Sequence, residues 1–286
     1  MKDYVAEFRN MLEFRGLTTR TINTYTTYIK RFLEFTEIVL EKEPKDVTWE
    51  ERRNFIMYAE SSCELSARTI NLVISVIRSF TIYVLHQHWD HTQLPKRKFD
   101  VYLPYVPSPE ETWAFISSIP DLKIKAMVSL LYSAGLRSSE LSQLRYEDIS
   151  REKMRVHIAK SKNRSEGYTQ LSSQALKYLT EYWIAYGKPR GWLFPGIRDS
   201  EKPIGSYVVL KGIRDHEKRL GLEHKITCHT FRHAIGTHLY QNGVDLPTIQ
   251  KFLRHKSVIS TLIYITLADS VFDTVVNPFD LMGEKA

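Results

Sequence analysis

Four prolines divide the chain into two parts of different character. Pro95, Pro104, Pro107 and Pro109 fall within fifteen residues, although the whole chain of 286 residues holds only eleven prolines. Proline lacks a backbone N–H and pushes the residue before it toward extended conformations, so neither a helix nor a central strand runs through such a region. The pattern predicts an extended interdomain linker over residues 94–107, between a domain at 1–93 and a domain at 108–286.

The first part, residues 1–93, carries apolar side chains at the three- and four-residue spacing of amphipathic helices. Ile22, Tyr25 and Ile29 are one such series. Thr18 and Ser66 are residue types that cap helix N-termini, and each stands just before an apolar series. The length fits about four helices, so the sequence predicts a small all-helical domain here.

The second part is predicted to be mainly helical with a small antiparallel sheet. Ser108 with Glu111 forms a capping-box pattern, and Ser138 is expected to cap a short helix. Two alternating segments, 153–160 and 168–171, are expected to pair as strands. Further helices are expected over 121–133, 173–186, 206–219, 230–241, 246–254 and 258–266.

The charge of the chain is compatible with a nucleic-acid partner. The formal net charge is +7, of which residues 1–100 contribute only +1 and the remainder +6. Lysine and arginine displace the counterions condensed on DNA, although a basic soluble protein without such a partner has the same balance. Two basic clusters are candidate DNA contacts, one in the linker and one in the turn between the predicted strands: Lys96, Arg97 and Lys98; Lys160, Lys162 and Arg164.

Composition also limits the compartment and the cofactors. The two cysteines, Cys63 and Cys228, form no CxxC pair, so neither a disulfide framework nor a cysteine zinc site is expected. The charged N-terminus lacks the apolar region of a signal peptide, and the most apolar stretch, 126–136, is too short to span a bilayer. We therefore expect a cytoplasmic protein with no membrane association and no cofactor.

A cluster of cationic side chains suits a phosphate. On a helix, His229 and Arg232 are three residues apart and share a face. The guanidinium fork binds two oxygens, and histidine exchanges a proton near neutral pH. His229 with His233 also has the i, i+4 spacing of zinc ligands, but the glutamate of an HExxH motif is missing, so no metal is expected.

Other candidates for chemistry lie on either side of this cluster. Arg137 follows a helix-ending glycine, His255 follows a short predicted helix, and Tyr264 comes nine residues later. Alone, Arg137 is an exposed arginine in a common turn, and a helical tyrosine is usually a core residue.

The order of these pieces resembles the tyrosine recombinase (phage integrase) family. The resemblance rests on the strings LYSAGLRSSELSQLRYEDI, HTFRHAIGTHLYQNGVDLPTIQKFLRHKS and STLIYITL. It is strong over about 108–270 and weaker over 1–93, which resembles the family's helical, SAM-like core-binding domain. The resemblance implies a C-shaped DNA clamp in which this domain and the catalytic domain hold opposite faces of the duplex.

The resemblance also assigns roles to individual residues. Arg137 and Arg232 match the arginines that clamp the scissile phosphate, and His229 matches a histidine that assists proton transfer. His255 matches a position that buttresses the phosphate or the tyrosine, and Tyr264 matches the nucleophile. Such a set can stabilise the negative charge that builds on phosphate oxygens without a metal.

The general acid is less clearly matched. Lys162 best fits the lysine that protonates the 5′-oxygen leaving group, and Lys160 is the alternative. Glu166 is an acidic departure in a turn expected to approach DNA, and Arg254 replaces a glycine that often precedes the histidine. Neither departure removes a catalytic group.

The resemblance implies a site-specific recombinase that forms a covalent 3′-phosphotyrosyl intermediate and needs neither metal nor ATP. Its partners would be double-stranded recombination sites and further copies of itself, a dimer on each site and a tetramer in synapsis. Residues 271–286 carry apolar side chains at roughly helical spacing and are expected to dock on a neighbouring protomer or, equally, on their own domain. Two alternatives remain, a non-catalytic DNA-binding protein and a type IB topoisomerase.

Overall fold

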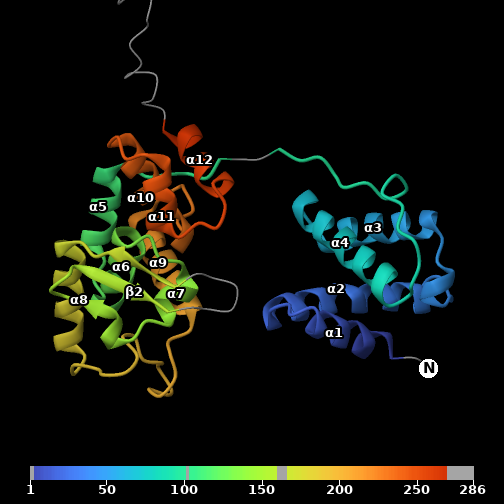
Figure 1. Cartoon of the computed structure of the whole chain (residues 1–286), viewed down its shortest axis with the longest axis horizontal. Coiled ribbons are helices and arrows are strands. Elements are labelled where there is room, and N and C mark those ends of the chain that lie inside the picture. Colours follow the sequence, from blue (N-terminus) through green and yellow to red (C-terminus); the bar gives the residue numbers. More distant parts are fainter. Residues whose placement is uncertain (1–2, 101–102, 160–165, 269–286) are drawn as a thin grey trace, which may run out of the picture. The chain divides into compact units, whose positions relative to one another are not determined.

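The computed structural model describes residues 3–100, 103–159 and 166–268. The chain forms two compact units, Met1–Tyr102 and Leu103–Ala286 (Figure 1). The basic turn residues 160–165 and the segment from 269 to the C-terminus lie outside the described residues.

The first unit is helical, and its helices begin where capping residues were predicted. It comprises α1 (Tyr4–Phe14), α2 (Thr19–Ile38), the 3-10 turn η1 (Pro44–Asp46), α3 (Trp49–Cys63) and α4 (Ala67–Tyr83). The predicted caps Thr18 and Ser66 are confirmed, because their side chains accept hydrogen bonds from the N–H groups of Thr21 and Thr69. These bonds satisfy donors that a helix N-terminus leaves unpaired.

Phenylalanines fill the core of this unit. Phe8 and Phe80 meet edge to face with their ring centroids 5.6 Å apart, and Phe32 and Phe55 do so at 5.1 Å. Leu94, at the start of the expected linker, is buried in the same core. The start of the proline-rich segment therefore packs against the helices of this unit, because burial of the apolar Leu94 side chain is favourable.

The second unit is mainly helical and contains a small sheet. Its elements are α5 (Pro109–Ser118), α6 (Leu122–Ser133), α7 (Ser138–Ser142), the 3-10 turn η2 (Tyr146–Asp148), β1 (Ile149–Ser150), β2 (Arg155–Ile158), β3 (Gly167–Gln170), α8 (Ser173–Ala185), α9 (Ser206–Leu220), α10 (Cys228–Gln241), α11 (Leu246–Leu253) and α12 (Ile259–Leu267). The strands are antiparallel in the order β1-β2-β3. The predicted pair is confirmed as β2 and β3, whereas the two-residue β1 is too short to show an alternating pattern.

The helix starts in this unit test two capping predictions. Ser108 and Glu111 form the predicted capping box, in which Oγ of Ser108 accepts from the N–H of Glu111 at 3.1 Å. The prediction that Ser138 caps α7 is wrong, because Arg137 occupies the N-cap position. The carboxylate of Glu140 accepts from the N–H of Arg137 at 2.9 Å, and thereby does the work of a capping side chain.

Helix α6 lies in the centre of the second unit, and α5, α8, α9 and α10 pack against it (Figure 1). Its residues from Ala126 to Leu131 are buried all round, which explains their uniformly apolar sequence. Helices α10, α11 and α12, orange to red in Figure 1, gather around a smaller apolar cluster that includes Ile249, Leu253 and Tyr264. None of the helices among the described residues has the length and apolar composition needed to cross a membrane.

Candidate functional site

The turn between α6 and α7 brings Arg137 to the site. Gly135 has φ +57°, and a Cβ at this position would lie 2.6 Å from Cδ2 of Leu253. Both the backbone conformation and this close approach require glycine. The turn therefore lies against the end of α11, and the Arg137 side chain beside it remains 23% exposed.

Arg232 lies beneath this turn and ties it to α11. Its side chain is buried, and its two terminal nitrogens donate to the carbonyl oxygens of Gly135 and Leu253. Burial, reinforced by the nearby charge of Arg137, lowers the pKa of Arg232 to about 9. The guanidinium therefore remains charged at neutral pH and holds two loops in place.

Glu140 joins two arginines. Its Oε1 accepts from Nη1 of Arg137 at 2.8 Å, and its Oε2 accepts from Nη2 of Arg254 at 3.0 Å. The Glu140 and Arg254 side chains are 6% and 5% exposed. Glu140 and Arg254 are 114 positions apart in the sequence, so no local pattern predicts their contact.

His255 and Tyr264 face one another with nearly parallel rings. The ring centroids are 6.2 Å apart and the planes differ by 12°. Nδ1 of His255 is 2.9 Å from Oγ1 of Thr261, one turn before the tyrosine on α12. Burial, followed by the charges of Arg232 and Arg137, lowers the pKa of His255 to about 4, so the imidazole is neutral at pH 7.

Tyr264 packs against α10 of its own chain. Its ring covers Gly236, where a Cβ would lie 2.6 Å from Cε1 of the tyrosine. The side chain is 1% exposed. Burial raises the pKa of Tyr264 to about 12, although the charges of Arg232 and Arg137 act in the opposite direction. Because both arginines lower the pKa of Tyr264, the phenol lies close enough to each guanidinium to interact with its charge.

The histidines of α10 differ in exposure. His229 lies in the first turn and is exposed, whereas His233 is partly buried between His229 and Tyr264. Burial and then the neighbouring His229 lower the pKa of His233 to about 4. Among the described residues no group of three or more histidine, cysteine, aspartate or glutamate side chains is placed to hold a metal ion.

The structure therefore gathers most of the predicted site. Arg137 from the turn before α7, Arg232 from α10, His255 from the turn after α11 and Tyr264 from α12 come together, and His229 lies at the start of α10. Sequence reasoning did not assign Glu140 and Arg254 to this site. The only sequence feature that could have indicated Glu140 is its position three residues after Arg137. For Arg254, that feature is a charged residue at a position where glycine is common.

The candidate DNA contacts are only partly described. Lys160, Lys162 and Arg164 lie outside the described residues. Lys96 and Lys98 are exposed, as a backbone-contacting lysine must be. Arg97 instead forms two hydrogen bonds to the carboxylate of Glu60, at 2.7 and 3.1 Å.

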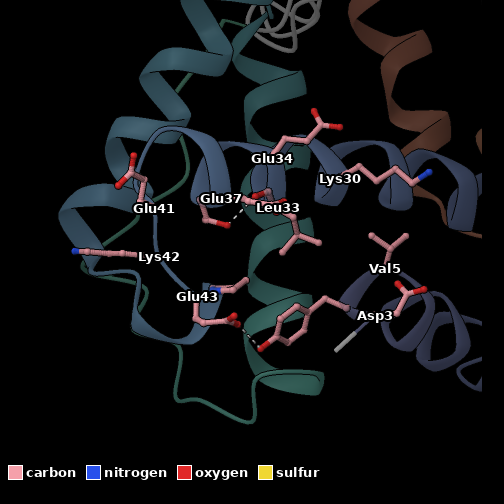
Figure 2. Close-up of a pocket in the computed structure, with 12 residues that line it drawn as sticks. Asp3, Val5, Lys30, Leu33, Glu34, Glu37, Glu41, Lys42 and Glu43 are labelled. Carbon is pink, nitrogen blue, oxygen red and sulfur yellow. Dashed lines mark hydrogen bonds between the residues drawn. The ribbon is translucent and has the colours of Figure 1, made fainter. Parts of the chain in front are cut away.

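A pocket of about 860 Å³ in the first unit has the wrong charge for DNA. It lies between α1, α2 and the chain that follows α2. Figure 2 shows Glu34, Glu37, Glu41 and Glu43 around it, with Lys30 and Lys42 among them. Nζ of Lys42 does not fully compensate these carboxylates, because it already pairs with Oε1 of Glu51 on α3 at 2.5 Å. Carboxylates repel phosphates, so this face of the unit is unsuited to a nucleic acid.

Two family models match the chain. Residues 110–270 match the model of the phage integrase family, and residues 5–91 match the N-terminal SAM-like domain of phage integrases. The chain is 29% identical over 264 residues to the tyrosine recombinase XerA of Pyrococcus horikoshii, covering 92% of this chain and 88% of that protein. It is 27% identical over 296 residues to the tyrosine recombinase XerD of Staphylococcus saprophyticus, covering 98% and 99%.

A solved structure shares the fold. A lambda integrase fragment, crystallised as a dimer bound to a COC′ core site, superposes with a TM-score of 0.73 at 18% identity, covering 92% of this chain and 94% of the fragment. The arrangement of helices and small sheet is therefore common to both chains.

Proposed function

Because this chain belongs to the phage integrase family of tyrosine recombinases, we propose that it is a site-specific DNA recombinase that uses Tyr264 as its nucleophile. The observation that carries the proposal is the position of Tyr264, whose ring packs on the helix that holds Arg232 and whose pKa responds to both Arg232 and Arg137. A phosphate bound by the two arginines would thus lie beside the phenol of the same subunit.

The proposed reaction transfers a phosphodiester from a 5′-oxygen to the tyrosine. Arg137 and Arg232 hold the non-bridging oxygens, where negative charge grows as Oη of Tyr264 bonds to phosphorus. The bond to the 5′-oxygen breaks, and Lys162, or Lys160 in its place, donates the proton that this oxygen needs. The 3′-phosphotyrosyl bond then retains the energy for rejoining, so the scheme consumes neither metal nor ATP.

The two histidines, His255 and His229, suit this scheme in different ways. His255 stacks on Tyr264 and is neutral at pH 7, so it can accept a hydrogen bond or a proton as the phenol ionises. His229, at the exposed start of α10, is accessible to a phosphate from solvent. Oriented groups of this kind accelerate reactions because they need no rearrangement as charge develops.

Tyr264 in the DNA-free chain is not ready to attack. With a pKa of about 12 the phenol is protonated at pH 7, and its side chain is almost wholly buried. A phosphate must displace whatever covers the ring or α12 must move. DNA binding is therefore proposed to expose the tyrosine as well as to supply its target.

The proposed partners are double-stranded recombination sites and other copies of the chain. The lambda integrase fragment is a dimer on its core site, which supports a dimer on each site here. We extend this to a tetramer in synapsis. Lys96, Lys98 and the basic turn at 160–165 would contact phosphates.

A pocket in the second unit supports exchange of the C-terminal segment between protomers. It measures about 380 Å³ and is lined by side chains of α5, α6, α8, α10 and α11, among them Trp113, Ile116, Leu239 and Phe252. We propose that the apolar residues of 271–286 from a neighbouring copy fill it. Burial of such side chains contributes about 25 cal/mol per Å² of apolar surface.

A trapped covalent complex tests the nucleophile. The chain is incubated in EDTA with nicked duplexes taken from the DNA that flanks its gene, in which the leaving strand diffuses away after cleavage. We expect a 3′-phosphotyrosyl adduct that survives denaturation, and mass spectrometry should map it to Tyr264.

Tyr264→Phe is the decisive variant in this experiment. It keeps the ring over Gly236 and should bind DNA as the parent does, yet form no adduct. An adduct formed by Tyr264→Phe would refute the assignment of the nucleophile. Relaxation of supercoiled DNA without any preferred site would favour the topoisomerase alternative.

A further inference from the structure

Arg254 occupies a backbone position that disfavours it. It follows α11 as the C-cap with φ +54°, in the left-handed region. A residue other than glycine is strained in such a conformation, which persists only where the surroundings stabilise it. The side chain must therefore supply contacts that glycine would lack.

Those contacts reach three segments. Nη2 of Arg254 binds Glu140 on α7, and Nη1 donates to the carbonyl of Phe252 at 3.1 Å. The side-chain stem lies beside β3, since a Cβ on Gly167 would be 3.6 Å from Cδ of Arg254. A single buried arginine thus connects the end of α11, the Arg137 turn and the strand that returns from the lysine turn.

The contact between Arg254 and Glu140 affects the net charge around Arg137 and Arg232, which form the proposed phosphate pocket. Burial raises the pKa of Glu140, but the charge of Arg254 and the hydrogen bonds from Arg137 outweigh it, and the net pKa is below the usual value. Glu140 is therefore an anion beside Arg137. Without Arg254 the carboxylate of Glu140 would offset the charge of Arg137. With Arg254, the charged groups that meet here among the described residues are three arginines and one carboxylate.

We propose that Arg254 is a positioning residue of the phosphate pocket. It orients Arg137 by sharing Glu140 with it, and it offsets the charge of that carboxylate so that both clamping arginines act at full strength. The inference rests on the proposed function. It goes beyond that function because it gives a task to a residue that stands where the family often has glycine.

Three substitutions at this position separate charge, length and backbone strain. Arg254→Met keeps much of the stem without the charge, Arg254→Lys keeps the charge, and Arg254→Gly removes the side chain and relieves the strain. In single-turnover cleavage of the nicked duplex we expect Arg254→Met and Arg254→Gly to form the adduct about 10- to 100-fold more slowly, the loss that small misplacements of catalytic groups cause. Arg254→Lys should recover most of the rate.

The matched control removes a charge elsewhere. Lys177→Met deletes an exposed lysine of α8, a helix that packs on α6, and should cleave at the parental rate. Thermal unfolding and DNA affinity are measured for each variant. Because Arg254→Gly relaxes the backbone, it provides the comparison if Arg254→Met does not fold.

A double substitution distinguishes positioning from general stability. In the Arg254→Met background, Glu140→Gln removes the unbalanced carboxylate, and we expect cleavage faster than with Arg254→Met alone. A merely structural role predicts a double variant as slow as the single one or slower, which would overturn the proposal. Parental cleavage by both Arg254→Met and Arg254→Gly would also overturn it and leave the nucleophile assignment intact. If the unaltered chain forms no adduct, the proposed function fails and this inference falls with it.

Discussion

Gly236 and Tyr264 share one small volume, because the tyrosine ring fills the space that any side chain at 236 would need. The glycine sits in the interior of α10, where it costs about 1 kcal/mol relative to alanine. The close approach of the ring to the helix backbone accounts for a residue that helix propensity alone disfavours.

Gly236→Ala should expose Tyr264 and destabilise the C-terminal unit. The added methyl overlaps the ring, and overpacking of this kind costs about 1–3 kcal/mol, which exceeds the roughly 1 kcal/mol gained in helix propensity. Urea unfolding measures the free energy, and chemical nitration followed by mass spectrometry measures access to the phenol.

Without the Tyr264 ring, Gly236→Ala should raise the free energy of unfolding instead of lowering it. In a Tyr264→Ala background the clash is absent, so Gly236→Ala should stabilise the chain by up to about 1 kcal/mol. Equal destabilisation in both backgrounds would show that the methyl clashes with something other than the tyrosine.

At the scale of single residues, the sequence predicted the side chains that match the family's motifs, but it did not predict the contact between Glu140 and Arg254. Arg137, Arg232 and Tyr264 could be chosen because family order marked them. The link from Glu140 to Arg254 joins residues 114 positions apart, and no local pattern indicates such a contact. The burial of Tyr264 was equally out of reach, because it depends on the packing of α12 onto α10.

At the scale of the elements, the hairpin of β2 and β3 is held by hydrogen bonds of a histidine, His157, whose protonation depends on pH. Nδ1 of His157 is 2.8 Å from Oδ1 of Asp148, and Nε2 is 3.0 Å from Oε1 of Glu166. These hydrogen bonds, first Asp148 and then Glu166, raise the pKa of His157. Glu166, the acidic departure of the turn, thus has a partner across the hairpin.

The hairpin should be better protected in mildly acidic solution than in alkaline solution. The folded-state pKa of His157 lies above its unfolded value of about 6.5, so its stabilisation is fully present below that pH and is lost as the pH rises through the folded-state pKa. Amide-exchange protection factors of β2 and β3, corrected for intrinsic rates, should fall about two- to fivefold from pH 6 to pH 8.5, the size expected for a partly exposed ion pair.

His157→Gln should abolish this pH dependence. The control is His91→Gln, which changes an exposed histidine of the other unit and should leave the dependence intact. Arg145, Glu147 and Lys153 are the other charged groups that line the pocket beside His157 and Asp148. Persistent pH dependence in His157→Gln would assign it to another group.

The elements were predictable where one residue determines the start of a helix. Thr18, Ser66 and Ser108 each cap through their own side chains. The start of α7 was predicted wrongly, because Glu140, inside the helix, accepts a hydrogen bond from the N–H of the N-cap residue Arg137. Strand β1 depends on its neighbour β2 and carries too few residues for a pattern of its own.

For the whole molecule, the proposed exchange of residues 271–286 can be tested by deletion. If residues 271–286 dock on a neighbour, their removal should leave the melting temperature nearly unchanged, because the described residues alone already form two apolar cores and the α10–α12 cluster. Cooperative assembly on a duplex with two binding sites should be lost. Mass photometry of the protein–DNA complexes measures the assembly.

Normal recombination and assembly by the truncated chain would contradict the proposed exchange. A large fall in melting temperature would instead show that the segment packs on its own domain. Trp113→Ala, which alters the proposed receiving pocket without changing the segment, should weaken assembly in the same way if exchange occurs.

The sealed position of Tyr264 has a consequence for the safety of the genome in which such an enzyme works. A protein that can break both strands of a chromosome is dangerous whenever it meets DNA alone. Because the proposed nucleophile Tyr264 is protonated and buried within its own subunit, a solitary copy would be chemically idle. DNA would then be cleaved only where binding exposes the phenol of Tyr264, so the small number of target sites in a genome would itself limit unwanted breaks.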